Sequence, residues 1–214
     1  MLIDPLPNII RANKLQEHTT IIGNNTVFTT TNHIYEPYEM EFNFICQSPK
    51  MIDDISQLFD GVGDLVWERE TNRILKATVI GGINYNTIKD NYILFSILFL
   101  VEPLKRNNDK EELITMIKQG VIINNLGTTP CLPLITVYGN GTCNIDISNQ
   151  QLTINNVVGY VTINNEIADV YKDNISFNHN TTGNIPILLP VGRSVASYSG
   201  GVTKLTIQKN ERWL

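Results

Sequence analysis

The part of the chain that follows Leu134 contains short segments rich in β-branched and aromatic residues, and this pattern limits the fold more than any other feature. Gly, Asn or Pro separates the segments about every 8 to 12 residues, which is the spacing typical of a β-sandwich. Strands packed this closely leave no room for a helix. The predicted strands are residues 134–138, 143–147, 151–154, 157–163, 166–171, 185–189, 195–198 and 202–208.

Turn residues mark the ends of several of these strands. The sequence Gly139-Asn140-Gly141 suits a tight turn, because glycine and asparagine tolerate positive φ better than other residues. The pairs Asn155-Asn156 and Asn164-Asn165 stand where two-residue hairpins require the same backbone conformation. We therefore predict a turn at each of these three places.

The stretch from Asn124 to Gly141 lies at a change in both pattern and composition. Gly127 permits positive φ, while Pro130 and Pro133 fix φ and donate no backbone hydrogen bond, so a regular element cannot run through them. The 91 residues from Asn124 onward contain five acidic and five basic side chains, whereas the residues before it contain 16 acidic and 11 basic ones. We therefore predict two domains, residues 1–123 and 124–214, joined at this stretch.

The first half contains a strand followed by a helix. Residues 39–46 alternate between apolar and polar side chains, which predicts a strand with one face in water. Ser48-Pro49 can begin a helix and the acidic pair Asp53-Asp54 suits its positive end, while Gly61 suits a left-handed stop. One face of this helix would be apolar and cover a sheet; its predicted members are Met51, Ile52, Ile55, Leu58 and Phe59.

Further strands are predicted in the first half. Residues 26–30 indicate a short strand in an otherwise unassigned arm, and residues 64–68 and 73–80 indicate a hairpin. Residues 92–101 are apolar on both alternating sets, so both faces of this strand require cover. Two interpretations stay open: a central strand of a sandwich, and a strand with one face buried against another subunit.

The segment between the two halves has two possible structures. Residues 109–118 have apolar side chains at helical spacing, which predicts a connecting helix. The alternative is a strand over residues 113–123.

The residues that carry enzymatic or metal chemistry are scattered. Cys46, Cys131 and Cys143 form no C-x-x-C pair, and the three histidines lie far apart, so we predict no metal site, no cofactor and no catalytic residue. Clustered carboxylates are more typical of charged strand faces and helix starts than of a glycosidase. Trp67, Trp213 and the tyrosines could stack on sugar rings, but we interpret them as core or interface aromatics. These carboxylates are Glu36, Glu39, Glu41, Asp53 and Asp54.

Net charge and hydropathy exclude other classes of partner. A formal net charge of -5 and the lack of a basic patch argue against tight binding of DNA or RNA. The longest apolar run is far shorter than the roughly 18 residues of a membrane helix, and the first residues lack the pattern of a secretory signal. We therefore expect a soluble protein.

Several segments, in the same order, resemble the distal tail protein (Dit) family of long-tailed siphophages. In the first half, residues 58–79 are similar to a glycine-containing motif and hairpin of that family, and residues 98–103 to the segment that closes its first domain. The resemblance covers roughly residues 50–214. In the second half the motif is carried by Asn125, Gly127, Thr128, Pro130, Pro133, Gly139, Gly141, Gly159, Tyr171, Pro186, Pro190, Gly192, Arg212 and Trp213.

The sequence departs from the family pattern at two places. Asn184-Ile185 precedes Pro186 where an acidic residue or Phe is usual, and Ser194 stands where Asn is usual.

The resemblance implies a mainly β structure without enzymatic activity: an N-terminal β-sandwich with a helix, followed by a C-terminal galectin-like β-sandwich. It implies a hexameric ring at the virion tail tip, assembled in the cytoplasm of the bacterial host. The implied partners are further copies of the chain, the tail tube protein, and the tail-associated lysin or fibre-hub protein, with a receptor-binding protein as a further candidate. DNA would pass through the ring without specific binding.

A second function is kept beside this one. The predicted β-sandwich is also compatible with a carbohydrate-binding module that recognises a host receptor. Some relatives carry sugar-binding insertions in the second domain, and the short loops of this sequence leave no room for one.

Overall fold

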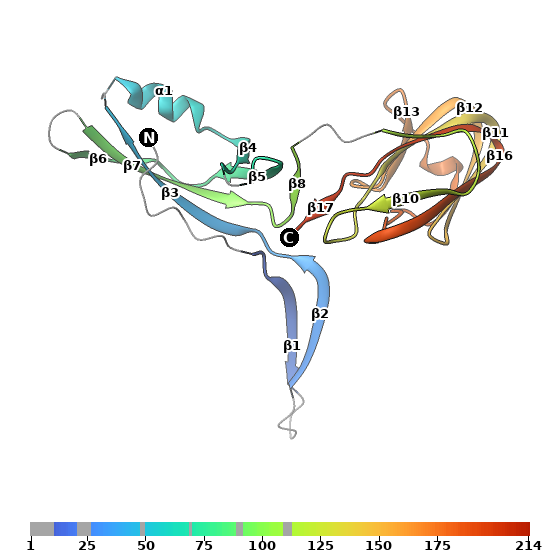
Figure 1. Ribbon diagram of the computed structural model, residues 1–214, viewed down its shortest axis with the longest axis horizontal. Helices are drawn as coiled ribbons and strands as arrows, with labels where there is room; N and C mark the ends of the chain where they lie inside the picture. Colours follow the sequence, from blue (N-terminus) through green and yellow to red (C-terminus); the bar gives the residue numbers. More distant parts are fainter. Residues whose placement is uncertain (1–10, 21–26, 48–49, 69, 89–91, 109–112) are drawn as a thin grey trace. The chain divides into compact units, whose positions relative to one another are not determined.

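The computed structural model describes residues 11–20, 27–47, 50–68, 70–88, 92–108 and 113–214 (Figure 1). The chain divides into two compact units: one ends at Lys105 and includes Leu214, and the other extends from Arg106 to Trp213. This division differs from the predicted boundary between residues 123 and 124. The reason is that strands β9 (Ile114–Met116) and β10 (Val121–Asn125) pair with β16 (Gly192–Gln208) of the second unit.

The first unit begins with a two-stranded antiparallel hairpin, β1 (Lys14–Thr20) and β2 (Val27–Tyr35). The strand predicted over residues 26–30 lies within β2 from Val27 onward, while Thr26 is outside the described residues.

A second sheet of the first unit has β7 (Tyr92–Val101) at its centre. One edge of β7 pairs with β3 (Tyr38–Cys46), and the other pairs with β5 (Arg73–Val79) and β6 (Asn84–Ile88) at its two ends. Strand β4 (Val62–Val66) pairs with β5. All pairs are antiparallel, and the predicted strands at residues 39–46 and 92–101 and the predicted hairpin are confirmed.

Helix α1 (Met51–Leu58) covers one face of this sheet. Ile55 is buried, and Ile52 and Phe59 pack against the same cluster as the sheet residues. The predicted apolar face is wrong at its edges, because Met51 is 46% exposed and Leu58 is 75% exposed. The predicted start at Ser48-Pro49 lies outside the described residues, and Gly61 has the expected positive φ of 84°.

The two faces of β7 differ in burial. Alternate residues from Ile93 to Val101 are buried in the core beneath α1. On the opposite face, Leu94, Leu98 and Leu100 are half-buried and do not belong to that core. Their strand neighbours on this face include the exposed Glu39 and Glu41 of β3, which lie directly opposite Leu100 and Leu98. We call this face of β7 the open face, because no described residue of the core beneath α1 covers it; it carries the three leucines beside acidic side chains.

The second unit is built on three long antiparallel strands, β11 (Leu134–Ile147), β12 (Gln150–Asn164) and β16 (Gly192–Gln208), which lie side by side in Figure 1. The strand order is β10-β16-β11-β12-β13-β14, with β9 on β16 and β15 on β12. The smaller elements are β13 (Asp169–Lys172), β14 (Ile175–Ser176), the 3-10 helix η1 (Asn178–Asn180) and β15 (Thr181–Gly183). Strand β8 (Lys105–Asn107) spans the division between the units, and β17 (Arg212–Trp213) ends the chain.

Three pairs of predicted strands are single strands that bend midway. The turn predicted at Gly139-Asn140-Gly141 is wrong, because β11 continues through these glycines and its register shifts there. A Cβ on Gly139 would overlap the carbonyl oxygen of Gly201, and one on Gly201 would overlap that of Asn140. Glycine is therefore required for the close approach of backbones at the bend.

The predicted asparagine hairpins are also corrected. Asn155 and Asn156 lie inside β12 opposite the single residue Thr142 of β11, so they form a bulge of β12, and Asn156 has a positive φ of 58°. The turn after Asn164 extends to Ala168, so it is longer than two residues. Two-residue hairpins with positive φ at both positions occur instead at Ser148-Asn149 and Asp173-Asn174.

Two further predictions are wrong. The described part of residues 109–118 contains β9 rather than a helix, because Met116 is fully buried while Ile117 is 69% exposed. Residues 185–189 form no strand; only Leu189 makes an isolated bridge, to Cys131. The prediction that no helix follows Asn124 misses the short η1.

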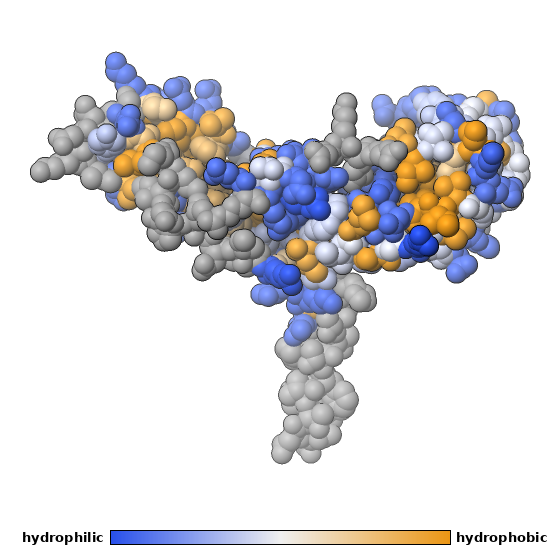
Figure 2. All heavy atoms as spheres, viewed as in Figure 1, coloured by the Kyte–Doolittle hydropathy of each residue, from blue (hydrophilic) through white to orange (hydrophobic). Residues whose placement is uncertain are grey.

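The predicted fold class is confirmed: the chain is mainly β, with antiparallel sheets and one α-helix. Among the described residues, no helix is both long and apolar enough to cross a membrane. All three cysteines are buried and none forms a disulfide bond. Figure 2 shows apolar residues gathered near α1 and β4 in the first unit, and over β10 and β16 in the second.

Candidate functional site: the Asn125 network

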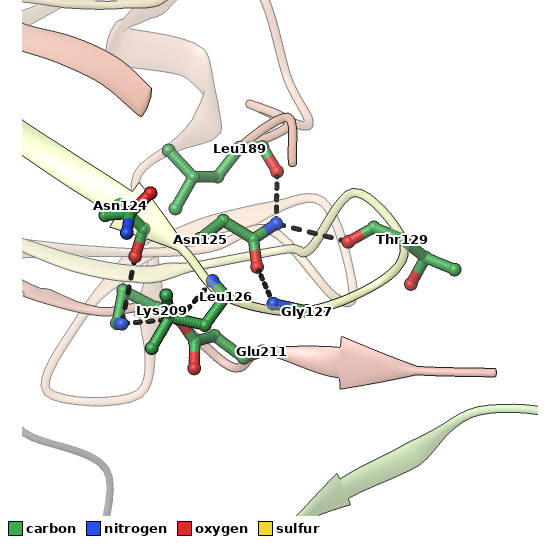
Figure 3. A network of polar contacts seen from close by, with 8 residues as sticks. All are labelled: Asn124, Asn125, Leu126, Gly127, Thr129, Leu189, Lys209 and Glu211. Carbon is green, nitrogen blue, oxygen red and sulfur yellow. Dashed lines mark hydrogen bonds and ion pairs between the residues drawn. The ribbon is translucent and has the colours of Figure 1, made fainter. Parts of the chain in front are cut away.

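Two residues of the predicted motif, Asn125 and Gly127, lie in a polar network at the end of β10 (Figure 3). Asn125 is only 2% exposed. Its Nδ2 donates to the carbonyl oxygens of Thr129 and Leu189, both at 3.1 Å, and its Oδ1 accepts from the backbone N–H of Gly127 at 2.9 Å. A buried amide with three partners holds the loop from residue 125 to 129 against the segment around Leu189.

Gly127 is required because of what lies beside it. A Cβ at this position would overlap the carbonyl oxygen of Arg212 and crowd Oδ1 of Asn125. The same Arg212 carbonyl accepts hydrogen bonds from the backbone N–H groups of Thr128 and Thr129, at 3.0 and 3.4 Å. The loop therefore lies directly against the last strand, which explains why the motif combines Gly127, Thr128 and Arg212.

A buried ion pair closes the other side of the loop. Glu211 is 5% exposed, and its Oε1 accepts from the backbone N–H of Leu126 at 2.8 Å and from Lys209 Nζ at 2.5 Å. Lys209 also donates to the carbonyl oxygen of Asn124 at 3.1 Å. Because each charge is paired and hydrogen-bonded, the burial of Glu211 is compensated.

Asn165 is a second buried side-chain amide, and it links the segment around Pro133 to the segment around Ile187. Its Nδ2 donates to the carbonyl oxygen of Pro133 at 2.6 Å, and its Oδ1 accepts from the N–H of Ile187 at 2.7 Å. Cys131 and Leu189 exchange two backbone hydrogen bonds nearby. All of these residues belong to the second unit, so residues 124–133 are part of that unit. Their role as a joint between domains stays a prediction.

The remaining motif residues have separate positions. Gly139, Gly141 and Gly159 lie at the strand bend, where Gly139 is paired with Gly159. Gly192 has a φ of 86° at the start of β16 and pairs with Asn125, so it adjoins the network.

Five others complete the motif. Tyr171 lies in β13 opposite Thr162, and Pro186 follows a cis peptide bond. Pro130 and Pro190 each follow a residue of the network, and Trp213 is half-buried in β17.

Sequence reasoning missed four residues that hold this region together: Asn165, Lys209, Glu211 and Gly201. Asn165, Lys209 and Glu211 have hydrogen-bond partners between 22 and 85 residues away in the sequence, apart from the Lys209–Glu211 pair itself. Lys209 and Glu211 are the exception, because they are only two residues apart and their opposite charges could indicate an ion pair. No periodic pattern marks partners so distant in sequence.

The network binds the chain to itself and offers no reactive group. Within the described ranges, no three or more His, Cys, Asp or Glu side chains lie close enough to hold a metal ion.

Burial is the main cause of a raised pKa at two described residues outside the network. Burial raises the pKa of Cys143, which disfavours the reactive thiolate at neutral pH. Burial, with a smaller effect of Glu70, raises the pKa of Tyr38.

Comparison with known proteins shows a similarity of structure. No family model matches the sequence, and no curated protein matches it. The structure is similar to the crystal structure of the Dit protein of phage SPP1, described as a paradigm of the hub adsorption apparatus in phages that infect Gram-positive bacteria. The TM-score is 0.74 at 12% sequence identity, and the alignment covers 100% of this chain and 94% of that one. The chain has a Dit-like fold.

This similarity includes both units. The alignment covers 100% of this chain, so it also includes the described residues before residue 50, where no resemblance to the family was identified. The network around Asn125 and Gly127 is thus part of a chain with a Dit-like fold.

Proposed function

We propose that this chain is a structural component of a phage tail tip, a distal tail protein that forms a hexameric ring. The observation that carries this proposal is the similarity of fold over 100% of this chain and 94% of the SPP1 Dit chain, with a TM-score of 0.74. The buried network of the second unit supports a structural role, because its polar groups are used in internal hydrogen bonds.

The open face of the first sheet is the surface we assign to contact between copies. Leu94, Leu98 and Leu100 are half-buried outside the core, and no helix covers them in the described part of the first unit. An apolar strip bordered by charged residues is typical of a protein interface. This assignment follows the second of the two interpretations given for residues 92–101.

The ring would join the tail tube protein to the tail-associated lysin or fibre-hub protein, with a receptor-binding protein as a further neighbour. DNA would pass through its lumen. The net charge of the first 123 residues is negative, so six copies would repel DNA phosphates and disfavour adhesion during ejection.

The position of the chain in the particle tests the proposed function. Antibodies raised against the second unit, coupled to gold, would be applied to virions of the phage that encodes the chain. Label at the distal end of the tail is expected. Label on the capsid or along the tail tube, with none at the tip, would contradict the proposal.

A further inference from the structure

A polar groove lies on the second unit, away from the Asn125 network. Its volume is about 410 Å³, within the range of roughly 300 to 1,000 Å³ that is usual for small-molecule sites. Three adjacent strands and the loop before β10 form it. The lining residues are Gln119, Asn144, Ile145, Asp146, Gln151, Leu152, Thr153, Ser197, Tyr198 and Ser199.

Strand register places the polar lining residues in two rows. Asn144 of β11 lies between Thr153 of β12 and Ser199 of β16, and forms the first row. The second row has Asp146 between its direct neighbours on the same two strands, Gln151 and Ser197. Because residues two apart on a strand share a face, all six lie on one side of the sheet. The groove therefore presents a grid of short polar side chains.

Hydrogen bonds within the rows position these groups. Thr153 Oγ1 donates to Asn144 Oδ1 at 2.9 Å, and Gln151 Nε2 donates to Asp146 Oδ2 at 3.2 Å. The Nδ2 of Asn144 and the hydroxyls of Ser197 and Ser199 have no hydrogen-bond partner among the described residues. Donors and acceptors thus alternate over the grid, and several remain available to a ligand.

The residues that line the groove disfavour anionic and apolar ligands. Asp146 is the one ionisable carboxylate of the lining and no Lys, Arg or His is present, so a phosphate or carboxylate would find no cation. Ile145 and Leu152 are buried in the core, and Tyr198 packs against it, so an apolar ligand would find little exposed hydrocarbon. A neutral molecule with several hydroxyl groups satisfies the grid best.

We propose that this groove binds a neutral saccharide, through paired hydroxyl groups that bridge the Asn144 and Asp146 rows. The site is formed by the sheet itself and requires no insertion in the loops. It goes beyond the ring-forming role, since the grid belongs to the second unit and the ring contact was assigned to the first.

Binding is tested by nuclear magnetic resonance titration of the isotope-labelled full chain with glucose and with N-acetylglucosamine. Saturable shifts confined to the amides of the two rows are expected for at least one sugar. Asp146→Ala removes a charged acceptor and should weaken that binding by at least about tenfold. Thr153→Ala, which removes a hydroxyl at the edge of the grid, should weaken it less.

Two controls make the outcome decisive. Glycerol phosphate should cause no shifts in the rows, since the groove lacks a cation. Asp173→Asn, in the turn between β13 and β14, should bind sugar like the unaltered chain. Absence of saturable shifts with either sugar, preference for glycerol phosphate, or undiminished binding by Asp146→Ala would overturn the proposal. None of these outcomes bears on whether six copies form a ring.

Discussion

The two units of the chain use antiparallel sheets in different ways. In the second unit, three long strands bend at glycines and enclose one core that includes Ile135, Ile145 and Leu205, all at most 2% exposed. In the first unit, α1 covers one face of the sheet and leaves half-buried leucines on the other face of β7. The second unit thus buries its apolar strand residues within its own core, whereas the first unit leaves one apolar sheet face on which a partner could pack. The following variants test this contrast.

The largest effect is expected for the bend of the second unit. Gly201→Ala would place a methyl group on the carbonyl oxygen of Asn140, which is backbone and cannot rotate away. The free energy of unfolding of this unit should fall by more than about 5 kcal/mol, an exceptional value for one residue. Urea unfolding followed by Trp213 fluorescence, in a Trp67→Phe background, measures it.

Gly141→Ala is the matched control for the bend. Its φ of 78° makes alanine strained, but no atom lies within 4 Å of the added Cβ. A loss of only about 1 to 2 kcal/mol is expected. Equal losses for both variants would show that close backbone approach does not determine the bend.

The next prediction compares the loss of unfolding free energy for substitutions on the two faces of β7 in the first unit. Phe99 is 6% exposed and packs against the rings of Phe42 and Phe59, so Phe99→Ala should cost about 3 to 5 kcal/mol. Leu100→Ala, on the open face, should cost no more than about 1 kcal/mol in the isolated chain. Unfolding followed by Trp67 fluorescence in a Trp213→Phe background measures both. Similar costs would mean that the second face is also a core.

A smaller effect is expected for the Asn125 network. Asn125→Ala leaves one N–H and two carbonyl oxygens without their partner, at a cost of about 2 to 3 kcal/mol. Asn124→Ala is the control, because the Asn124 side chain is exposed and only its carbonyl oxygen is used. Thermal unfolding of both variants gives the comparison. A large loss of stability for Asn124→Ala, or no loss for Asn125→Ala, would contradict the view that the Asn125 side chain stabilises this loop.

The smallest effect concerns the surface of the second unit. The Tyr160 hydroxyl donates to Asp173, and this hydrogen bond is the main cause that raises the pKa of Tyr160 above 10.0. Because the folded state favours the neutral phenol, this stabilisation is complete below pH 10.0 and is lost as pH rises through the folded-state pKa. Asp173→Asn should lower the midpoint in an absorbance titration, whereas Asp146→Asn should not. An unchanged midpoint in Asp173→Asn would contradict the assigned cause.

Periodicity made part of the fold predictable. The alternation of apolar and polar residues in 39–46 and the apolar run in 92–101 located two strands, and the helical spacing after Met51 located α1. It could not distinguish a turn from a bend, because Gly139-Asn140-Gly141 suits both; the decisive contact with Gly201 is distant in sequence. The same limit applies to the site, where Asn125 and Gly127 were identified but their partners Leu189 and Glu211 were not.

The number of copies in the assembled protein tests the central claim most directly. Leu98→Lys would place a cation opposite Glu41 on the open face, which preserves the strand pair while removing the apolar contact. Ile175→Lys is the control, since Ile175 is 70% exposed in the second unit. Native mass spectrometry of the full chain should give six copies for the unaltered chain and for Ile175→Lys, and one copy for Leu98→Lys. A single copy of the unaltered chain at every concentration, or six copies of Leu98→Lys, would contradict the account.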